Sequence, residues 1–358
     1  MTPIPAPEGS PDIGVPWHYG DPFAEQRAAA RRVAVVDRSN REVIAVTGPE
    51  RLSWLHLVIS QHMTELADGT ATEALVLDSQ GRVDTHMEVA HHDETVWLDT
   101  DPGAHATGAR GGQQPLLEYL RSMVFWSKVE LRDATSERAV LTLLGPETDD
   151  LLTKVTLPVP GPHEVAGAEG VLVRRGALGV DLLVPRDDHQ LWWDRLTANG
   201  ARPMGSWGYE AFRVEAGRPR MDIDTDERTI PHEVGWVHVA AHVAKGCYRG
   251  QETVAKVHNV GRPPRRMLLL HLDGSPEVLP ETGDPVVNGE RTVGRVGSVV
   301  RHHELGPIAL ALVKYSVPLD TELLAGQDDR VVQAAIDPDL VPEATPGLGR
   351  EAARRLRG

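Results

Sequence analysis

The sequence has little cysteine, no long apolar run and no N-terminal targeting pattern. Its 358 residues contain one thiol, Cys247, so an intrachain disulfide cannot form and the disulfide framework of a small secreted domain is excluded. No apolar run approaches the ~20 residues needed to span a bilayer. The N-terminus has neither the basic stretch nor the apolar run of a signal peptide. These absences predict a cytoplasmic protein without membrane contact.

Positive charge and aromatic residues are also scarce. Lysine and arginine number 37 against 52 aspartates and glutamates, which gives a formal net charge of −15. Such a chain repels nucleic acid and anionic membranes on average, so either contact requires a local basic patch. Aromatic residues make up only 4% of the chain, and eight of them are tryptophan. Tryptophan suits a flat, ring-shaped ligand, but it also fills protein cores.

Strand and helix patterns interleave in the first three quarters of the chain without a regular βαβ repeat, which predicts an α+β domain. A hairpin is expected at 74–90, with Asp78 to Gly81 as its turn. Segment 102–114 is expected to be a loop. Helices are expected at 27–36, 50–62, 116–125, 187–198, 206–216 and 251–259.

After Pro263 and Pro264 the helical pattern almost disappears. Strands are expected at 265–272, 286–287, 292–300, 308–315 and 331–336, with Asn288-Gly289 as a hairpin turn. This pattern predicts a small antiparallel β-barrel. The expected organisation is therefore a flexible arm at 1–16, a domain at 17–262 that is open to division into two subdomains, the barrel at 263–340 and a polar tail at 341–358.

The single thiol lies in an unusual segment, because residues 245–252 read Lys-Gly-Cys-Tyr-Arg-Gly-Gln-Glu. A lone cysteine is usually a small buried hydrophobe. Burial of Lys245 and Arg249 would be costly, however, and the helix expected from Gln251 places Cys247 just before a helix N-terminus. Positive neighbours and a helix N-terminus both favour the thiolate. We therefore predict a reachable, reactive thiolate at Cys247.

The same part of the chain is basic within an acidic protein. Six cations and one acid, Glu252, lie between residues 245 and 266. A basic strip indicates an anionic ligand, whereas the alternative is a solvated face paired with the acidic run 222–227. The cations are Lys245, Arg249, Lys256, Arg262, Arg265 and Arg266.

The octapeptide at 245–252 resembles the signature of the YgfZ folate-binding family. Its flanks, Ala-Gly-Arg-Pro at 216–219, Thr-Ile-Pro-His-Glu at 229–233 and the arginines at 265–266, follow in the order that this family shows. The resemblance implies an aminomethyltransferase (GcvT)-like fold and a tetrahydrofolate cofactor, or a derivative of it, in a central cleft. It also implies a role, more accessory than catalytic, in assembling or repairing iron–sulfur proteins, including one that modifies tRNA.

Folate has a flat pterin and an acidic glutamyl tail, and a carboxylate that accepts two pterin N–H groups is the expected anchor. Glu215 lies in an Arg-Val-Glu-Ala-Gly segment similar to the one that supplies this carboxylate in aminomethyltransferases. Arg262 or Arg266 is expected at the glutamyl tail. Tyr248 and Trp207 are candidate stacking surfaces, with core packing as the alternative. The octapeptide supplies the other candidates for the folate site, Lys245, Arg249, Gln251 and Glu252.

One feature departs from the transferases. Their return strand in the first hairpin carries paired aspartates, one of which works on the folate nitrogen, and the equivalent positions here are Thr85 and His86. Amine transfer needs a positioned proton acceptor, so this substitution counts against it. Asp84, His86 and Glu88 share one strand face by the two-residue period. Such a row could form a site, but we expect it to be the solvent side of a half-buried strand.

No metal site is predicted. His232, Glu233 and His238 lack the spacing of a helical zinc motif. A cluster held by this chain alone is also not expected, because iron–sulfur centres usually take about four thiolates and the chain has one.

Three functions follow. The first is a folate-binding accessory protein for iron–sulfur assembly or client proteins. The alternative is a folate-dependent aminomethyltransferase or demethylase that acts on a methylamine-type substrate. The third is a tRNA contact through the basic strip, which the overall acidity disfavours.

Overall fold

The computed structural model describes residues 2–108, 111–246, 248–260, 262–275 and 277–341. The chain divides into two compact units. The first unit contains residues 1–75 and 85–210, and the second contains residues 76–84 and 211–358. Within the described ranges, no helix has both the length and the apolar character that crossing a membrane requires.

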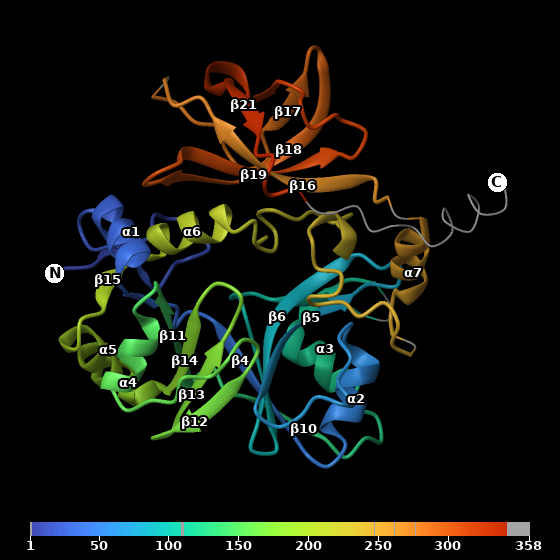
Figure 1. Cartoon of the computed structure of the whole chain (residues 1–358). Helices are drawn as coiled ribbons and strands as arrows, with labels where there is room; N and C mark the ends of the chain where they lie inside the picture. Colours follow the sequence, from blue (N-terminus) through green and yellow to red (C-terminus); the bar gives the residue numbers. More distant parts are fainter. Residues whose placement is uncertain (1, 109–110, 247, 261, 276, 342–358) are drawn as a thin grey trace, which may run out of the picture. The chain divides into compact units, whose positions relative to one another are not determined.

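The first unit contains a five-stranded antiparallel sheet with a helical cover (Figure 1). Helices α2 (Arg51–Val58) and α3 (Leu116–Ser122) pack against its strands. The Trp54 indole N–H donates to the Met123 carbonyl at 2.9 Å and so fixes the end of α3 against α2. In spatial order the strands are β10 (Glu130–Asp133), β4 (Glu42–Thr47), β7 (Thr95–Thr100), β6 (Val83–His92) and β5 (Thr70–Leu77).

A six-stranded sheet forms the other layer of the first unit. Its strands, in spatial order, are β12 (Val165–Ala168), β13 (Val171–Arg175), β14 (Val180–Pro185), β11 (Arg138–Leu144), β3 (Ala34–Asp37) and β15 (Arg202–Met204). Only β15 runs parallel to its neighbour among the pairings described here. Helices packed on or beside this sheet are α1 (Pro22–Arg31), α4 (Thr148–Lys154), η1 (Arg186–Asp188) and α5 (His189–Ala198).

Two apolar clusters hold these layers together. One joins the two sheets and includes Val43 and Trp97 from the first and Val140 and Leu183 from the second. The other packs the far face of the second sheet against α4 and α5, where Trp192 is 3% exposed. Each buried side chain of this size stabilises the fold by roughly 1.5–3 kcal/mol. The first unit is thus a layered structure with a core on both faces of its second sheet.

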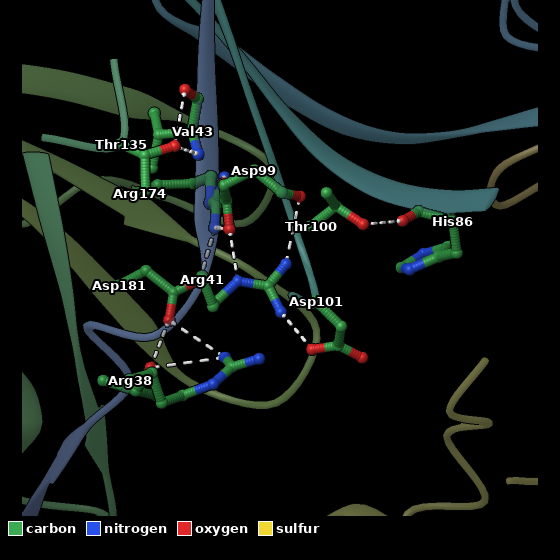
Figure 2. Close-up of polar contacts among 11 residues, drawn as sticks. Arg38, Arg41, Val43, His86, Asp99, Thr100, Asp101, Thr135, Arg174 and Asp181 are labelled. Atoms are coloured by element: carbon green, nitrogen blue, oxygen red, sulfur yellow. Dashed lines mark hydrogen bonds and ion pairs between the residues drawn. The ribbon is translucent and has the colours of Figure 1, made fainter. Parts of the chain in front are cut away.

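A buried ion-pair network also crosses from sheet to sheet (Figure 2). Asp99 on β7 is inaccessible to solvent, and it accepts hydrogen bonds from Arg41 Nε at 2.7 Å and from the fully buried Arg174 on β13. Arg174 also donates to Asp181 on β14 at 2.7 Å. Burial acts to raise the pKa of Asp99, but the two guanidiniums outweigh it and hold that pKa well below its usual range. Asp99 is therefore ionised, and its charge links the two sheets.

The second unit contains a closed six-stranded barrel, drawn in orange to red in Figure 1. Its interior is apolar, with Leu268, Val286, Ala311 and Ala334 among the buried residues. The strands in order around the barrel are β16 (Arg265–Leu272), β19 (Gly306–Lys314), β18 (Arg291–His302), β17 (Pro285–Asn288), β20 (Leu323–Ala325) and β21 (Val332–Ile336), and η3 (Asp328–Arg330) precedes β21.

The second unit also holds the turn of the β5–β6 hairpin against helix α7 (Gln251–Val260). Gly250, which precedes α7, has φ +78°, and a Cβ atom there would lie 2.5 Å from the Gly81 Cα and 2.7 Å from the Asp78 carbonyl oxygen. Such a distance is too short for any side chain, so only glycine allows the two backbones to approach this closely. The Val83 N–H donates to the Thr229 carbonyl at 2.9 Å and fixes the hairpin on its other side.

The predicted α+β class with a C-terminal antiparallel barrel is confirmed. The expected helix at 27–36 is wrong: α1 ends at Arg31, and the valines that follow form the buried strand β3. The expected loop at 102–114 contains the short hairpin β8 (His105–Thr107) and β9 (Gln113–Pro115). In the barrel, Asn288 pairs with Arg291, so the two turn residues are 289–290 and lie one position later than expected.

Other differences concern short elements. Strand β1 (Ile4–Pro5) pairs with β2 (Pro16–His18) at the N-terminus, and strands β12 and β20 were not expected. Helix α6 (Ser206–Glu215) begins and ends within one residue of its expected range. The expected helix at 187–198 divides into η1 and α5.

The buried network predicts a large effect at Asp99. Asp99→Asn leaves the guanidiniums of Arg41 and Arg174 buried without their shared anion, and we expect it to lower the free energy of unfolding by about 3–5 kcal/mol. The matched control is Asp101→Asn, because Asp101 also binds Arg41 but its side chain is 34% exposed. That change should cost at most about 1 kcal/mol. Urea unfolding followed by tryptophan fluorescence measures both, and equal small losses would contradict the prediction.

The close approach of the two turns predicts a second effect. Gly250→Ala should destabilise the second unit by more than the roughly 1–3 kcal/mol of a left-handed backbone alone, because the methyl group also collides with Gly81. Gly235→Ala is the matched control, since Gly235 has φ +75° but open space around its Cα. Thermal and urea unfolding of both variants gives the comparison. A Gly250→Ala protein as stable as the control would show that the turns do not touch.

Candidate functional site

Within the octapeptide, Arg249 and Gly250 form a turn that leads into α7. Gln251 donates from its side chain to the Lys245 carbonyl at 2.9 Å and so closes the turn on itself. Arg249 is half-buried, and Glu252 in the first turn of α7 is exposed. Cys247 lies outside the described residues, so its reactivity stays a prediction. The turn is thus held from both ends, by Gln251 within it and by Gly250 against the hairpin.

Lys245 does not behave as expected. The sequence predicts an exposed ammonium, but Lys245 is only 4% exposed and its nitrogen lies 4.8 Å from the centre of the Tyr248 ring. Burial lowers the pKa of Lys245 to about 7, so a large fraction of this amine is neutral at physiological pH. The expectation failed because a lysine stem can be buried when an aromatic face receives its ammonium.

Tyr248 shares this buried environment. It is 8% exposed, and its hydroxyl has no hydrogen-bond partner among the residues that the structure describes. Burial raises the pKa of Tyr248 to about 12, so the hydroxyl keeps its proton and remains a donor. A buried donor without a partner costs roughly 1–3 kcal/mol, which a ligand or water acceptor would recover.

Contacts within the protein reduce the number of cations in the basic strip that are available to a ligand. Arg265 binds Glu233 at 2.8 Å and Asp226 at 3.0 Å. Burial acts to raise the pKa of Asp226, but the bond from Arg265 outweighs it and the pKa falls to about 2. Arg266 is 8% exposed and donates to the Val317 carbonyl at 2.6 Å. Part of the strip is therefore structural, and the acidic run supplies one of its counter-ions. Arg262 is exposed beside these residues.

Glu215 ends helix α6 and remains partly accessible. Its side chain is 42% exposed, and its carboxylate lies 3.4 Å from the His302 Nε2 atom on β18. Phe212, one turn earlier, packs edge-on against the same imidazole, with ring centroids 5.8 Å apart. The interaction with His302 lowers the pKa of Glu215, so the carboxylate is ionised at neutral pH. An ionised, reachable carboxylate at a helix end can accept two N–H groups from a planar ring.

Trp207, near the start of α6, packs at the N-terminal end of the first unit. Its ring lies edge-on to Phe23, with centroids 5.4 Å apart, and 6.4 Å from the His18 ring. This environment is typical of core packing, which is the alternative that the sequence left open for Trp207.

Three histidines of the second unit come together in a way that the sequence did not predict. The rings of His232 and His238 lie 6.2 and 5.4 Å from that of His258 on α7. Both ring nitrogens of His232 are inaccessible and lack hydrogen-bond partners in the described ranges. Burial, with help from the other two imidazoles, lowers the pKa of His232 to about 4 and keeps it neutral. No spacing rule could reveal this cluster, because its members come from three separate segments.

The polar row on β6 is also more than a solvated face. Thr85 is buried and donates its hydroxyl to the His105 carbonyl. His86 lies on the opposite face, 84% buried, with its Nε2 atom 2.7 Å from a Glu73 carboxylate oxygen. Glu88 joins them, and these three side chains bring one ligand atom each within 4.8 Å of one another. The sequence indicated His86 and Glu88 but missed Glu73, which lies on the neighbouring strand.

Known proteins are similar in sequence to most of this chain. An aminomethyltransferase of Streptomyces avermitilis is 26% identical over 84% of this chain and 83% of its own length. A chloroplastic protein of Arabidopsis thaliana, named "Putative transferase At1g60990", is 26% identical over 74% of this chain. The match spans 61% of that protein. Both similarities are distant, and they extend over most of the chain.

The fold has a solved counterpart. The glycine cleavage system aminomethyltransferase T of Bartonella henselae superposes with a TM-score of 0.78 over 90% of each chain, at 16% sequence identity. At that identity the likeness establishes the fold, and it confirms the expected aminomethyltransferase-like architecture. Residues 14–243, more than half of the chain, match the GCVT N-terminal domain. The chain therefore belongs to the GCVT family.

Proposed function

We propose that this protein binds tetrahydrofolate and acts on its one-carbon unit as a transferase or demethylase of methylamine-type substrates. The observation that carries the proposal is the family match over residues 14–243, together with aminomethyltransferase relatives aligned along four-fifths of the chain. The aligned length is 84% of the chain and exceeds the family domain at 14–243, so the similarity is not confined to that domain. Similarity beyond one domain supports a shared ligand.

Glu215 is the proposed pterin anchor. His302 keeps its carboxylate ionised, and an exposed fraction of 42% leaves oxygen lone pairs for a ligand. The pterin offers adjacent N–H donors in one plane, which a carboxylate accepts in a bidentate manner. Arg262, Arg249 and Glu252 are half-buried or exposed and stay candidates for the folate tail and its surroundings. Arg266 and Trp207 are weaker candidates, because each is already packed within the protein.

The chemistry at the hairpin differs from that of a transferase with paired aspartates. Thr85 and His86 stand at those positions, and Thr85 faces away from His86. The imidazole of His86, held by Glu73, is the group on this strand that could accept a proton during transfer. A carboxylate bound to one ring nitrogen orients the imidazole, so the other nitrogen can replace an aspartate as the proton acceptor.

A second candidate function rests on the octapeptide. Lys245-Gly246-Cys247-Tyr248-Arg249-Gly250-Gln251-Glu252 resembles the YgfZ signature, which favours an accessory role for iron–sulfur enzymes in the cytoplasm, with a tRNA-modifying enzyme among its clients. In that role Cys247 is the reactive group. Any cluster it touches must take its other ligands from a partner, since the chain has a single thiol.

Calorimetric titration with tetrahydrofolate tests the folate site. Glu215→Gln keeps the shape but removes the charge, and we expect it to weaken binding at least tenfold, in line with the roughly 1.5–3 kcal/mol of a charged hydrogen bond. The control is Glu227→Gln, an exposed acid of the same unit that should bind folate as the wild type does. An unchanged affinity in Glu215→Gln would remove Glu215 from the site. Absence of binding by the wild-type protein would overturn the function.

A transfer assay separates the two roles. Incubation of the wild-type protein with tetrahydrofolate and secondary or tertiary methylamines should yield methyl-tetrahydrofolate and the demethylated amine, an exchange of a methyl group for the folate N–H proton that needs no oxidant. His86→Ala should lower the rate by about 10²–10⁴-fold if His86 accepts that proton. If no methylamine is consumed, the accessory role predicts that Cys247→Ala lowers the activity of iron–sulfur enzymes in cells while folate affinity is unchanged. Normal client activity in that variant would exclude the accessory role.

A further inference from the structure

We propose that Glu73, His86 and Glu88 form a binding site for a divalent transition-metal ion of the zinc type. The site goes beyond the proposed folate function, because it adds a metal ion that folate chemistry does not require, although it shares His86 with the proposed transfer step. Its ligands are side chains of the hairpin strands β5 and β6 within the first unit. Each side chain supplies one atom, an imidazole nitrogen from His86 and a carboxylate oxygen from each glutamate.

The geometry fits an ion of this size. Zinc binds nitrogen and oxygen ligands at about 2.0–2.2 Å, so neighbouring ligand atoms around it lie about 3.0–3.6 Å apart. The His86 Nε2 atom is 2.7 Å from a Glu73 oxygen, and all three ligand atoms fall within 4.8 Å of one another. The three ligand atoms therefore already lie close to the separations found in a coordination shell.

The ligand types select the kind of metal. An imidazole with carboxylates suits zinc, iron or cobalt, whereas magnesium and calcium prefer oxygen alone. Two carboxylates balance the charge of a divalent ion, and three protein ligands leave a fourth position open. That arrangement is typical of zinc sites that bind a water molecule or an oxygen ligand of a substrate. It differs from closed structural sites, which use four protein ligands.

The surroundings hold the ligands in place. Thr100 on β7 donates its hydroxyl to the His86 carbonyl at 2.8 Å, as Figure 2 shows, and so fixes the backbone of β6 at the ligand. Glu88 pairs with Asp99 across the β6–β7 ladder, and its charge interacts with the Arg174 guanidinium. Neighbouring positions on the other face of β6, such as Met87 and Val89, are fully buried. The three ligands therefore project from a rigid strand pair, which favours metal binding over a flexible surface cluster.

Burial argues that the group is more than a surface ion pair. The side chain of Glu73 is 5% exposed and that of His86 is 16% exposed. A buried carboxylate carries a large desolvation cost, and two glutamates meet here around one imidazole. A divalent ion offsets that cost for both glutamates together.

Metal titration of the intact protein tests the site. After dialysis against a chelator, the wild-type protein should bind one Zn²⁺ per chain in calorimetry, and Co²⁺ should give the intense visible absorption of a four-coordinate ion. His86→Gln and Glu73→Gln should each weaken zinc binding at least 100-fold. The control is His92→Gln, a half-buried histidine of the same strand outside the group, which should bind as the wild type does.

Zinc binding is measured without folate. The metal proposal can therefore fail while the folate function stands, and the folate function can fail while the metal site stands. Circular dichroism shows whether each variant is folded. If either variant unfolds, an anomalous difference map of a wild-type crystal soaked in zinc chloride decides: a peak between His86 and the two glutamates supports the site. No stoichiometric binding, equal affinity in all variants, or a peak only at other histidines, His232 and His258 among them, would overturn it.

Discussion

The first unit depends on one anion placed between two arginines. Asp99 has no contact with solvent and receives hydrogen bonds from Arg41, which directly precedes β4 of the first sheet, and from Arg174 on β13 of the second. Apolar packing holds the sheets together without fixing their register, since hydrophobic contact has no direction. The ion pairs do have direction, and an error in register would leave a charge buried alone at a cost of several kcal/mol. The network therefore specifies one arrangement of the two sheets more than it adds stability.

This constraint extends to the polar row beside it. Asp99 is paired across the ladder with Glu88, and the next residue of β7, Thr100, binds the backbone of His86. A strand whose partner is fixed by a buried charge cannot slip by one residue, and such a slip would turn His86 and Glu88 to the opposite face. The network and the candidate site are thus consecutive parts of one strand pair. In the second unit, two glycines fix the position of the backbone instead. Gly81 and Gly250 allow the hairpin turn and the turn before α7 to come into backbone contact.

The sequence predicted features that depend on local pattern. Strand β16 has the predicted bounds, and α6 and α7 differ from theirs by one residue, because periodicity and terminal residues are local properties. Prediction from the sequence failed where tertiary contacts determine the secondary structure or the burial of a residue. Ala34 to Val36 continue the helical pattern of α1 but form a strand, because they pair with β11 and are buried in the core of the sheet. Lys245 was expected at the surface, and only the position of the Tyr248 ring explains its burial.

In the candidate site, too, local pattern predicted some features, and tertiary contacts determined the others. The period of two placed Asp84, His86 and Glu88 on one half-buried face, as expected, but it did not show that Glu73 on the next strand lies 2.7 Å from His86. No pattern within β6 contains information on that partner. Pairing in β-sheets depends on register, which the sequence of one strand does not determine. The octapeptide at 245–252 illustrates the contrast, because a contiguous motif is visible in the sequence, whereas a site assembled from several strands is not.

The resemblance to aminomethyltransferases implies an aspartate where this strand has His86, and an imidazole offers different chemistry there. An aspartate offers an oxygen that is ionised at neutral pH, whereas a neutral imidazole has one nitrogen lone pair. The Glu73 carboxylate accepts from Nε2 at 2.7 Å, so the lone pair lies on Nδ1, where it can accept a proton. In the proposed metal site Nε2 binds the ion instead, the ring proton lies on Nδ1, and that lone pair is no longer available. Proton transfer by His86 and metal binding at its Nε2 atom are therefore exclusive states of one imidazole, and occupancy of the proposed metal site determines whether His86 is available as a base.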